Sequence, residues 1–283
     1  MDGGVLKSVR VLSKNEFDGY REMIRIITKL DQEDGLFKIL RVNYLEFKDS
    51  LSDHVTNYVH SGNKGDYLYK IIPFDLNRLI MNFLSSVRMF VDHTETRLKH
   101  EYGRASDEVK FWELETKTSS DKSFAYRFLW KLRNYAQHLG IPAGSINLNS
   151  RLSADSTPHY ELLLSLQRDT LLQYNRWGSQ VTEELSRKPP TFDIIPLIDE
   201  LFEILSAMHE NLGTKIYPQY LTVGNTLITL IRECEMAGGI PGLFETIGSG
   251  EKCTINITNF PFDFIGKITG VQINILREDS ESI

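Results

Sequence analysis

Cysteine is scarce in this sequence, with only Cys234 and Cys253 among 283 residues. Two cysteines supply neither a framework of several disulfides nor a four-cysteine zinc site, so both kinds of small, covalently stapled domain are excluded. Sparse cysteine is also typical of proteins in a reducing compartment. We therefore expect a cytoplasmic location.

Long apolar runs are absent as well. No stretch approaches the roughly 20 consecutive apolar residues that a membrane-spanning helix needs. The N-terminus lacks the charged and then apolar pattern of a secretory signal. We expect no membrane among the partners of this protein.

An excess of positive charge is the third absence. The chain has 32 Lys and Arg residues against 38 Asp and Glu residues, which gives a formal net charge of −6. Proteins that coat nucleic acid generally are basic overall, so that class is excluded, whereas a local basic site is not. The content of hydrophobic residues, 41%, is that of an ordinary globular chain, and this length makes one large domain or two small ones.

Helical periodicity dominates the first half of the sequence, where apolar residues recur every three or four positions. Pro73 is of a type favoured in the first turn of a helix, and Gly103 is placed to end the helix that Pro73 begins. The helices expected here cover residues 15–30, 34–60, 73–102 and 106–117, and a polar turn is expected at 119–121.

The pattern changes after residue 142. Ser, Asn, Gly and Pro are frequent in 143–158, which predicts a loop with a short strand at 145–148, and the apolar run 159–167 predicts a further strand. The remaining expected elements are helices over 168–187, 193–210 and 220–236 and strands over 253–259 and 267–276.

These elements predict a mainly α (α+β) fold: a helical bundle with additional helices and a small C-terminal antiparallel sheet that joins the middle of the chain to its end. The expected segments are an N-terminal helical segment, a helical core, and C-terminal helices with the sheet, either separate or as one continuous domain. Their bounds are residues 1–72, 73–142 and 143–283.

The stretch 123–142 carries the functional interpretation. Its aromatic and apolar residues recur at spacings of four and three, which predicts an amphipathic helix that ends at the Gly-Ile-Pro segment 140–142. Arg133, Asn134 and His138 lie on its last turns. Asn134 and His138 are four residues apart and share a face, whereas Arg133 lies about 140° round the helix from His138.

At these positions the chain resembles the HEPN superfamily, the helical domains of many prokaryotic toxin and defence ribonucleases. The family pattern is an Arg, four to six residues and a His, usually with a polar residue directly after the Arg, the place that Asn134 fills. The resemblance covers about residues 73–142. It implies a bundle that forms a homodimer, so that two Arg–His pairs meet in one cleft.

The resemblance also implies a metal-independent endoribonuclease without a cofactor, acting as a toxin or a phage-defence effector under the control of a regulatory protein. The ribose 2′-hydroxyl would attack the adjacent phosphate. His138 would serve as general acid or base, Arg133 would bind the phosphate and the charge of the transition state, and Asn134 would complete the catalytic set.

The side chains suit these roles on chemical grounds. An imidazole exchanges protons near neutral pH, and a guanidinium pairs bidentately with phosphate. Basic and aromatic residues around the pair are candidates for binding RNA through its phosphates and bases. The substrate-binding candidates are Arg127, Lys131 and Tyr135.

A spacing of four residues between Arg and His has low specificity, because Arg88 and His93 match it too. Met89 follows that arginine in place of a polar residue, and the pair lies in the middle of an expected helix. We therefore prefer Arg133 and His138.

Two alternatives stay open. In the first, the pair is structural: His138 caps carbonyls at the helix C-terminus, and Arg133 lies along Trp130 or pairs with a carboxylate. In the second, the helical bundle is a non-catalytic regulatory module that binds a nucleotide or a protein. His93 and His100, seven residues apart, are interpreted as polar surface, so no metal site is expected.

Overall fold

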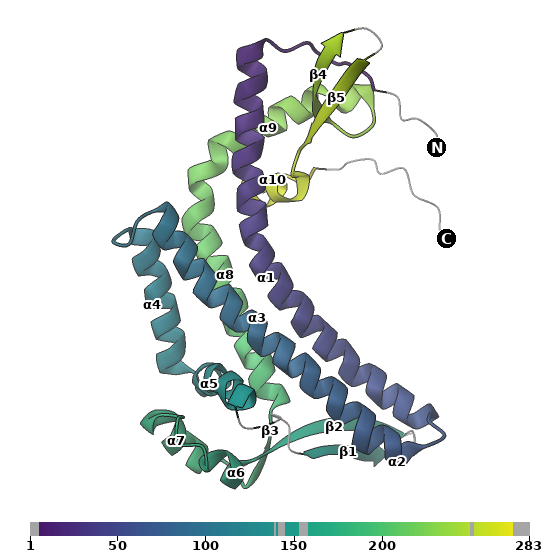
Figure 1. Ribbon diagram of the computed structural model, residues 1–283, viewed down its shortest axis with the longest axis vertical. Helices are drawn as coiled ribbons and strands as arrows, with labels where there is room; N and C mark the ends of the chain where they lie inside the picture. Colours follow the sequence, from purple (N-terminus) through teal and green to yellow (C-terminus); the bar gives the residue numbers. More distant parts are fainter. Residues whose placement is uncertain (1–5, 139, 141–144, 153–157, 250–251, 274–283) are drawn as a thin grey trace. The chain divides into compact units, whose positions relative to one another are not determined.

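The computed structural model describes residues 6–138, 140, 145–152, 158–249 and 252–273. It is mainly helical with small antiparallel sheets, one of them near the C-terminus, which confirms the predicted fold class (Figure 1). Within these residues, no helix is both long and apolar enough to cross a bilayer.

The chain divides into two compact units, residues 36–212 and residues 1–35 with 213–283. Neither division falls at 72/73 or 142/143, where the sequence suggested segment boundaries. Two helices, α1 (Lys14–His60) and α8 (Ile195–Ile216), continue from one unit into the other. An unbroken helical period gives no sign of a boundary, so composition could not reveal this division.

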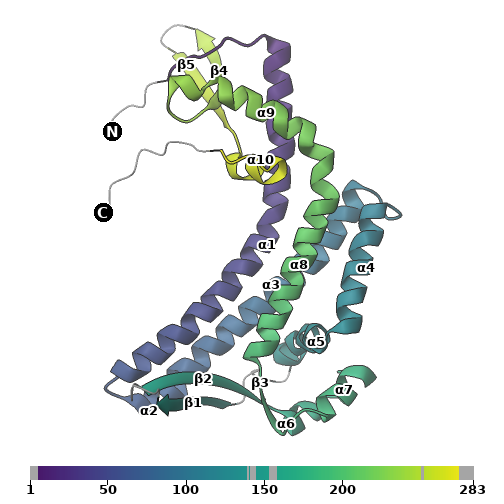
Figure 2. The ribbon, with the colours of Figure 1, turned by 180° about the vertical axis from the view of Figure 1, so that it is seen from behind.

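Helices make up most of the unit 36–212. In Figures 1 and 2, α3 and the second half of α1 run side by side within this unit. The further helical elements of this part are α2 (Lys64–Asp66), the π-helical turn η1 (Tyr67–Ile71), α3 (Ile72–Glu101), α4 (Asp107–Lys122) and α5 (Phe124–His138).

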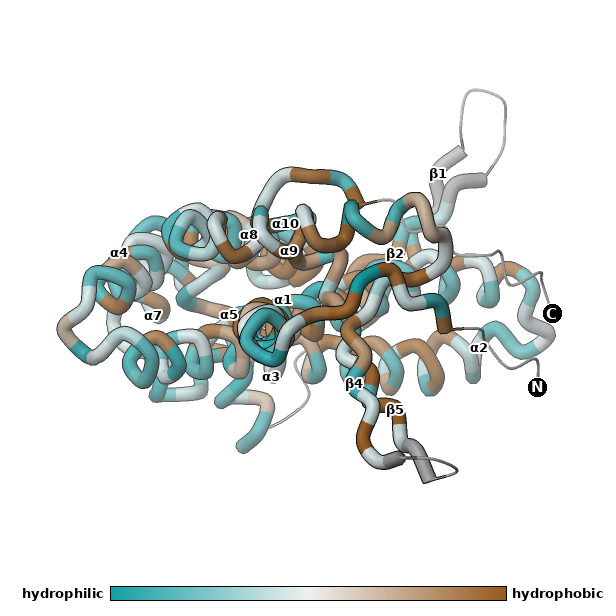
Figure 3. Tube along the Cα trace, turned by 90° about the horizontal axis from the view of Figure 1, so that it is seen from above, coloured by the Kyte–Doolittle hydropathy of each residue, from teal (hydrophilic) through white to brown (hydrophobic). Residues whose placement is uncertain are grey.

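The helix α3 is the most extensively buried of these. Its buried residues, among them Leu76, Ile80, Phe83 and Val87, recur at helical spacing, so one face is apolar. Figure 3 shows the result as brown and teal segments that alternate along the helical tubes. Pro73 stands in the first turn of α3, as predicted.

Two helix predictions need correction. The runs 15–30 and 34–60 form the single helix α1, because polar residues between them interrupt the apolar pattern without breaking the helix. The expected turn at 119–121 is the last part of α4, since the side chains of Ser119 and Ser120 do not prevent helical backbone bonds, and Ser123 donates its N–H to the carbonyl of Ser119.

The sheet of this unit has the order β1–β2–β3, all antiparallel, with β1 (Ser145–Leu152), β2 (Pro158–Gln167) and β3 (Thr191–Asp193). The strand predicted at 159–167 is confirmed as β2, but the expectation of one sheet shared with the C-terminus is wrong. Both hydrogen-bonded partners of β2 lie within its own unit. The segment 168–187, expected as one helix, forms α6 (Arg168–Leu172) and α7 (Ser179–Ser186) on either side of Gly178, whose φ of +78° no helix contains.

The other unit contains the first part of α1, the end of α8, the turns η2 (Tyr217–Tyr220) and η3 (Glu235–Ala237), and α9 (Leu221–Glu233). Its core is apolar side chains of α1, α9 and α10 (Phe262–Thr269), such as Ile27, Leu227 and Ile265. Asp34 is enclosed there and accepts hydrogen bonds from Lys267 at 2.7 Å and Tyr217 at 3.5 Å.

A hairpin of β4 (Gly242–Ser249) and β5 (Lys252–Asn259) completes this unit, and β5 confirms the strand predicted at 253–259. The strand expected over 267–276 is wrong as far as residue 273. Residues 267–269 belong to α10, whose buried Phe264, Ile265 and Ile268 follow a helical period, and residues 270–273 lie in no strand. Residues 274–276 lie outside the described part.

Candidate functional site

Helix α5 carries the predicted site, and Ser123 fixes where it begins. The Ser123 hydroxyl accepts a hydrogen bond from the backbone N–H of Tyr126 at 3.0 Å and donates one to Glu200 at 2.5 Å. Phe128 and Leu132 are completely buried on its inner face. The helix is therefore anchored at its start and along one face, and its last turns hold the residues of interest in fixed positions.

Arg133 and His138 differ in exposure but share one property. Arg133 is half-buried, and its Nε is enclosed without a hydrogen-bond partner. His138 is exposed and is the last residue of α5, while Asn134 is half-buried on the same face of the helix. Among the described residues, Arg133 and His138 make no hydrogen bond or ion pair, so neither is committed to holding the fold together.

The three predicted substrate-binding residues lie in internal contacts. Arg127 forms a bidentate ion pair with Glu184 and also donates to the carbonyl of Ser120. Lys131 donates to the carbonyl of Trp177. These bonds attach α5 to α7 and to the segment before it, so both cations have structural partners.

Tyr135 is also part of this attachment. Its ring is 9% exposed and packs against the rings of Tyr174 and Trp177, with centroids 5.5 and 5.7 Å away. A ring enclosed in this way offers no open face for a nucleobase. The sequence placed Tyr135 on α5 correctly but could not show what lies opposite it.

The competing pair, Arg88 and His93, lies on α3. Arg88 donates to Asp92 at 2.7 Å, and its guanidinium carbon lies 4.2 Å from the ring centroid of Trp130. Contact with Trp130 and pairing with a carboxylate were the structural roles considered for Arg133. In the folded chain Arg88 fills both, and His93 is exposed on its own.

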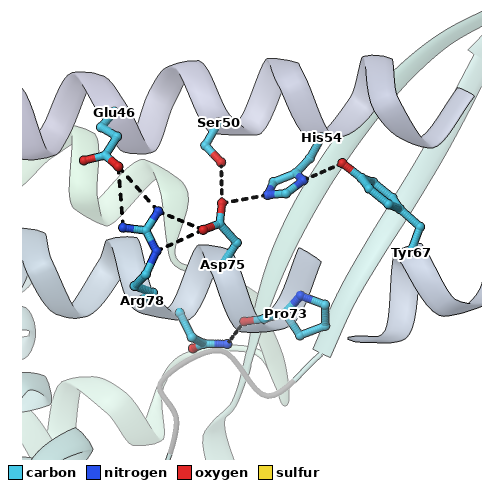
Figure 4. Close-up of polar contacts among 8 residues, drawn as sticks. Glu46, Ser50, His54, Tyr67, Pro73, Asp75 and Arg78 are labelled. Carbon is cyan, nitrogen blue, oxygen red and sulfur yellow. Dashed lines mark hydrogen bonds and ion pairs between the residues drawn. The ribbon is translucent and has the colours of Figure 1, made fainter. Parts of the chain in front are cut away.

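A second polar cluster, which the sequence interpretation missed, joins α1 to η1 and α3 (Figure 4). His54 is only 7% exposed; its Nδ1 lies 2.9 Å from the hydroxyl of Tyr67 and its Nε2 lies 3.1 Å from Oδ2 of Asp75. Ser50 donates to the same Oδ2 at 3.1 Å. The spacing of four between Ser50 and His54 was the available signal, because it places both on one face of a helix.

Arg78 completes the cluster. It donates two hydrogen bonds to Oδ1 of Asp75, at 2.8 and 3.0 Å, and reaches Glu46 at 3.4 Å. Partial burial acts to raise the pKa of Asp75, but the hydrogen bonds from Arg78, His54 and Ser50 stabilise the carboxylate, and the pKa is lowered below its ordinary value.

The cluster contains a Ser, a His and an Asp, yet its geometry is not that of a hydrolase triad. In a triad the imidazole lies between the carboxylate and the hydroxyl. Here Asp75 lies between Ser50 and His54, and the other imidazole nitrogen faces Tyr67. The cluster therefore acts as a clamp between helices and not as a source of a nucleophile.

Within the described residues, no group of three or more His, Cys, Asp and Glu side chains is arranged to hold a metal ion. Comparison with known proteins adds nothing to this geometry: no family model matches the chain, and no curated protein or solved structure matches it significantly.

Proposed function

We propose that this chain is a metal-independent endoribonuclease whose catalytic groups are Arg133, Asn134 and His138 on the last turns of α5. The observation that supports the proposal most strongly is the contrast in pairing along α5. Arg127 and Lys131 are held by partners within the fold, whereas Arg133 and His138 have none among the described residues.

The proposed chemistry needs only what these side chains supply. The ribose 2′-oxygen forms a bond to phosphorus as its proton passes to a base, and the bond from phosphorus to the 5′-oxygen breaks as that oxygen gains a proton from an acid. The products are a 2′,3′-cyclic phosphate and a 5′-hydroxyl. An imidazole can fill either role.

Two copies of the chain provide the two roles at once. In a homodimer, as the resemblance to HEPN domains implies, His138 of one copy takes the first proton and His138 of the other supplies the second. Arg133 from each copy binds the non-bridging oxygens, where negative charge develops. We place this activity in the cytoplasm, in a toxin or a phage-defence effector restrained by a regulatory protein.

The test is cleavage of a mixed RNA pool in excess chelator, with fragment ends identified by mass spectrometry. His138→Ala and Arg133→Ala should each abolish cleavage while their circular dichroism spectra stay those of the native protein. His93→Ala is the matched control: it removes an exposed histidine of the competing pair and should leave the rate unchanged. Equal rates from all four proteins would rule out the assigned residues.

A non-catalytic nucleotide- or protein-binding module is the second candidate. It is favoured by the internal pairing of Arg127 and Lys131 and by the burial of Tyr135, which leave few groups to hold RNA. RNA binding measured by fluorescence anisotropy separates the candidates. Binding that Arg133→Ala weakens, without cleavage by the wild type, would favour the module over the enzyme.

A further inference from the structure

A shallow groove of about 470 Å³ lies between α1 and α3, on the unit 36–212. Its walls combine two exposed apolar side chains, Val42 and Leu45, with a row of carboxylates. The charged residues that line it are Glu46, Asp49, Asp53, Asp75 and Arg78. Four carboxylates therefore face one guanidinium.

The order of residues on the α1 wall is informative. Val42, Glu46, Asp49 and Asp53 follow one another at spacings of four, three and four, so they form one stripe along the helix. The stripe is apolar at one end, where Val42 is 61% and Leu45 42% exposed, and acidic at the other. A ligand that fits the groove must therefore be apolar over one helical turn and positively charged over the next two.

The acidic end is unfavourable for the isolated helix. Like charges three or four residues apart repel each other and destabilise a helix. Asp49 and Asp53 are exposed and have no ion-pair partner among the described residues, unlike Asp75, which Arg78 neutralises. A positively charged partner would relieve this repulsion.

The floor of the groove is held in place before any partner arrives. The contacts of Asp75 with His54, Ser50 and Arg78 fix α3 against α1 directly beneath the acidic row (Figure 4). Leu79, which lines the same groove, is 1% exposed and fully packed. A surface that needs no rearrangement loses little free energy in ordering when it binds.

From this charge pattern we propose that the groove docks a basic amphipathic helix of a partner protein. The apolar side chains of the partner helix contact Val42 and Leu45, and its Lys or Arg side chains pair with Glu46, Asp49 and Asp53 along the next turns. RNA is excluded from this surface, because its phosphates would meet the carboxylates. The proposal does not depend on the chemistry at the end of α5.

Fluorescence anisotropy with a labelled synthetic helix tests it. The probe is an 18-residue Leu/Lys peptide with Leu on one face over its first turns and Lys over the rest; a peptide with Glu in place of Lys is the control ligand. Asp49→Asn combined with Asp53→Asn should weaken binding about fivefold, since each exposed ion pair contributes modestly. Asp107→Asn with Asp121→Asn, which makes the same change in net charge on exposed positions of α4, should change binding less than twofold.

A second variant separates docking from simple charge attraction. Val42→Ser combined with Leu45→Ser keeps every charge and should also weaken the Leu/Lys peptide several-fold. Equal binding by this variant, or by the Asp49 and Asp53 variant, would overturn the proposal, as would tight binding of the Glu peptide. If Val42→Ser with Leu45→Ser instead converts a dimer of the chain to monomer, the occupant is a second copy and the proposed partner is wrong.

Discussion

Asp75 is the residue on which the polar contacts between α1 and α3 converge, since its two oxygens accept from Arg78, His54 and Ser50. We predict that Asp75→Asn lowers the free energy of unfolding at pH 7 by about 2 kcal/mol, because an amide cannot replace a charged acceptor. Urea unfolding monitored by circular dichroism measures the change. Asp121→Asn, an exposed residue of α4, should have almost no effect.

The same residue predicts a dependence on pH. The pKa of Asp75 in the folded chain is below its ordinary value of 3.8, so the carboxylate stabilises the fold fully above that value. As the pH falls below 3.8 toward the lowered pKa, this contribution is lost. The difference in stability between wild type and Asp75→Asn should therefore shrink between pH 5 and pH 3, and a difference that stays constant would contradict this assignment.

At this scale the sequence located part of the site and missed the rest. Arg133, Asn134 and His138 were placed on the last turns of a helix, which is where they lie, because the signal is local. The partners of Arg127 and Lys131 come from residues 46 to 57 positions further along the chain. No local pattern reveals such a partner, so a basic residue on the sequence looked available when it was already paired.

At the scale of single elements, two serines begin two helices of this unit. Ser106 accepts from the N–H of Val109 at the start of α4, and Ser123 accepts from the N–H of Tyr126 at the start of α5. Ser106→Ala should cost about 1 kcal/mol of stability, and Ser123→Ala more, about 2 kcal/mol, because it also removes the bond to Glu200. Thermal unfolding of both variants checks the order, which the reverse result would refute.

Two helical glycines should respond to alanine with opposite signs. A Cβ at Gly35 in α1 meets nothing within 4 Å, so Gly35→Ala should stabilise the protein by up to about 1 kcal/mol through helix propensity. A Cβ at Gly213 in α8 would lie 2.7 Å from Cε2 of Tyr217, whose ring packs against Phe264. Gly213→Ala should therefore destabilise by about 1 kcal/mol or more. Calorimetric melting temperatures that move in the same direction would show that the ring of Tyr217 yields easily.

Elements with a strong period were predictable, and those defined by distant contacts were not. The bounds of α3 and α5 follow from apolar stripes and from Pro73 and Gly103. The short helix α10 was mistaken for a strand, since alternation near residues 271–275 obscured the helical spacing of Phe264 and Ile268. Pairing of β2 within its own unit depends on β1 and β3, which carry weak signals of their own.

At the scale of the whole molecule, the proposed chemistry requires two copies of the chain. We predict that the protein sediments at twice its monomer mass of 32.6 kDa and that its specific activity falls on dilution below the dimer dissociation constant. Analytical ultracentrifugation and cleavage assays over one concentration series measure both. The inactive His138→Ala variant should remain a dimer, and activity independent of concentration in a monomer would exclude a composite site.

The hairpin of β4 and β5 has a consequence for the colloidal behaviour of the protein. Phe244 and Ile257 stand opposite each other in its register, and with Ile255 they leave an apolar face 38 to 53% exposed, visible as brown on both strands in Figure 3. Residues 254–259 contain neither charge nor proline, the two features that keep strand edges apart in concentrated solution. Concentrated stocks should therefore tend to associate through this hairpin, and a lysine at position 257 is the substitution best placed to keep them dispersed.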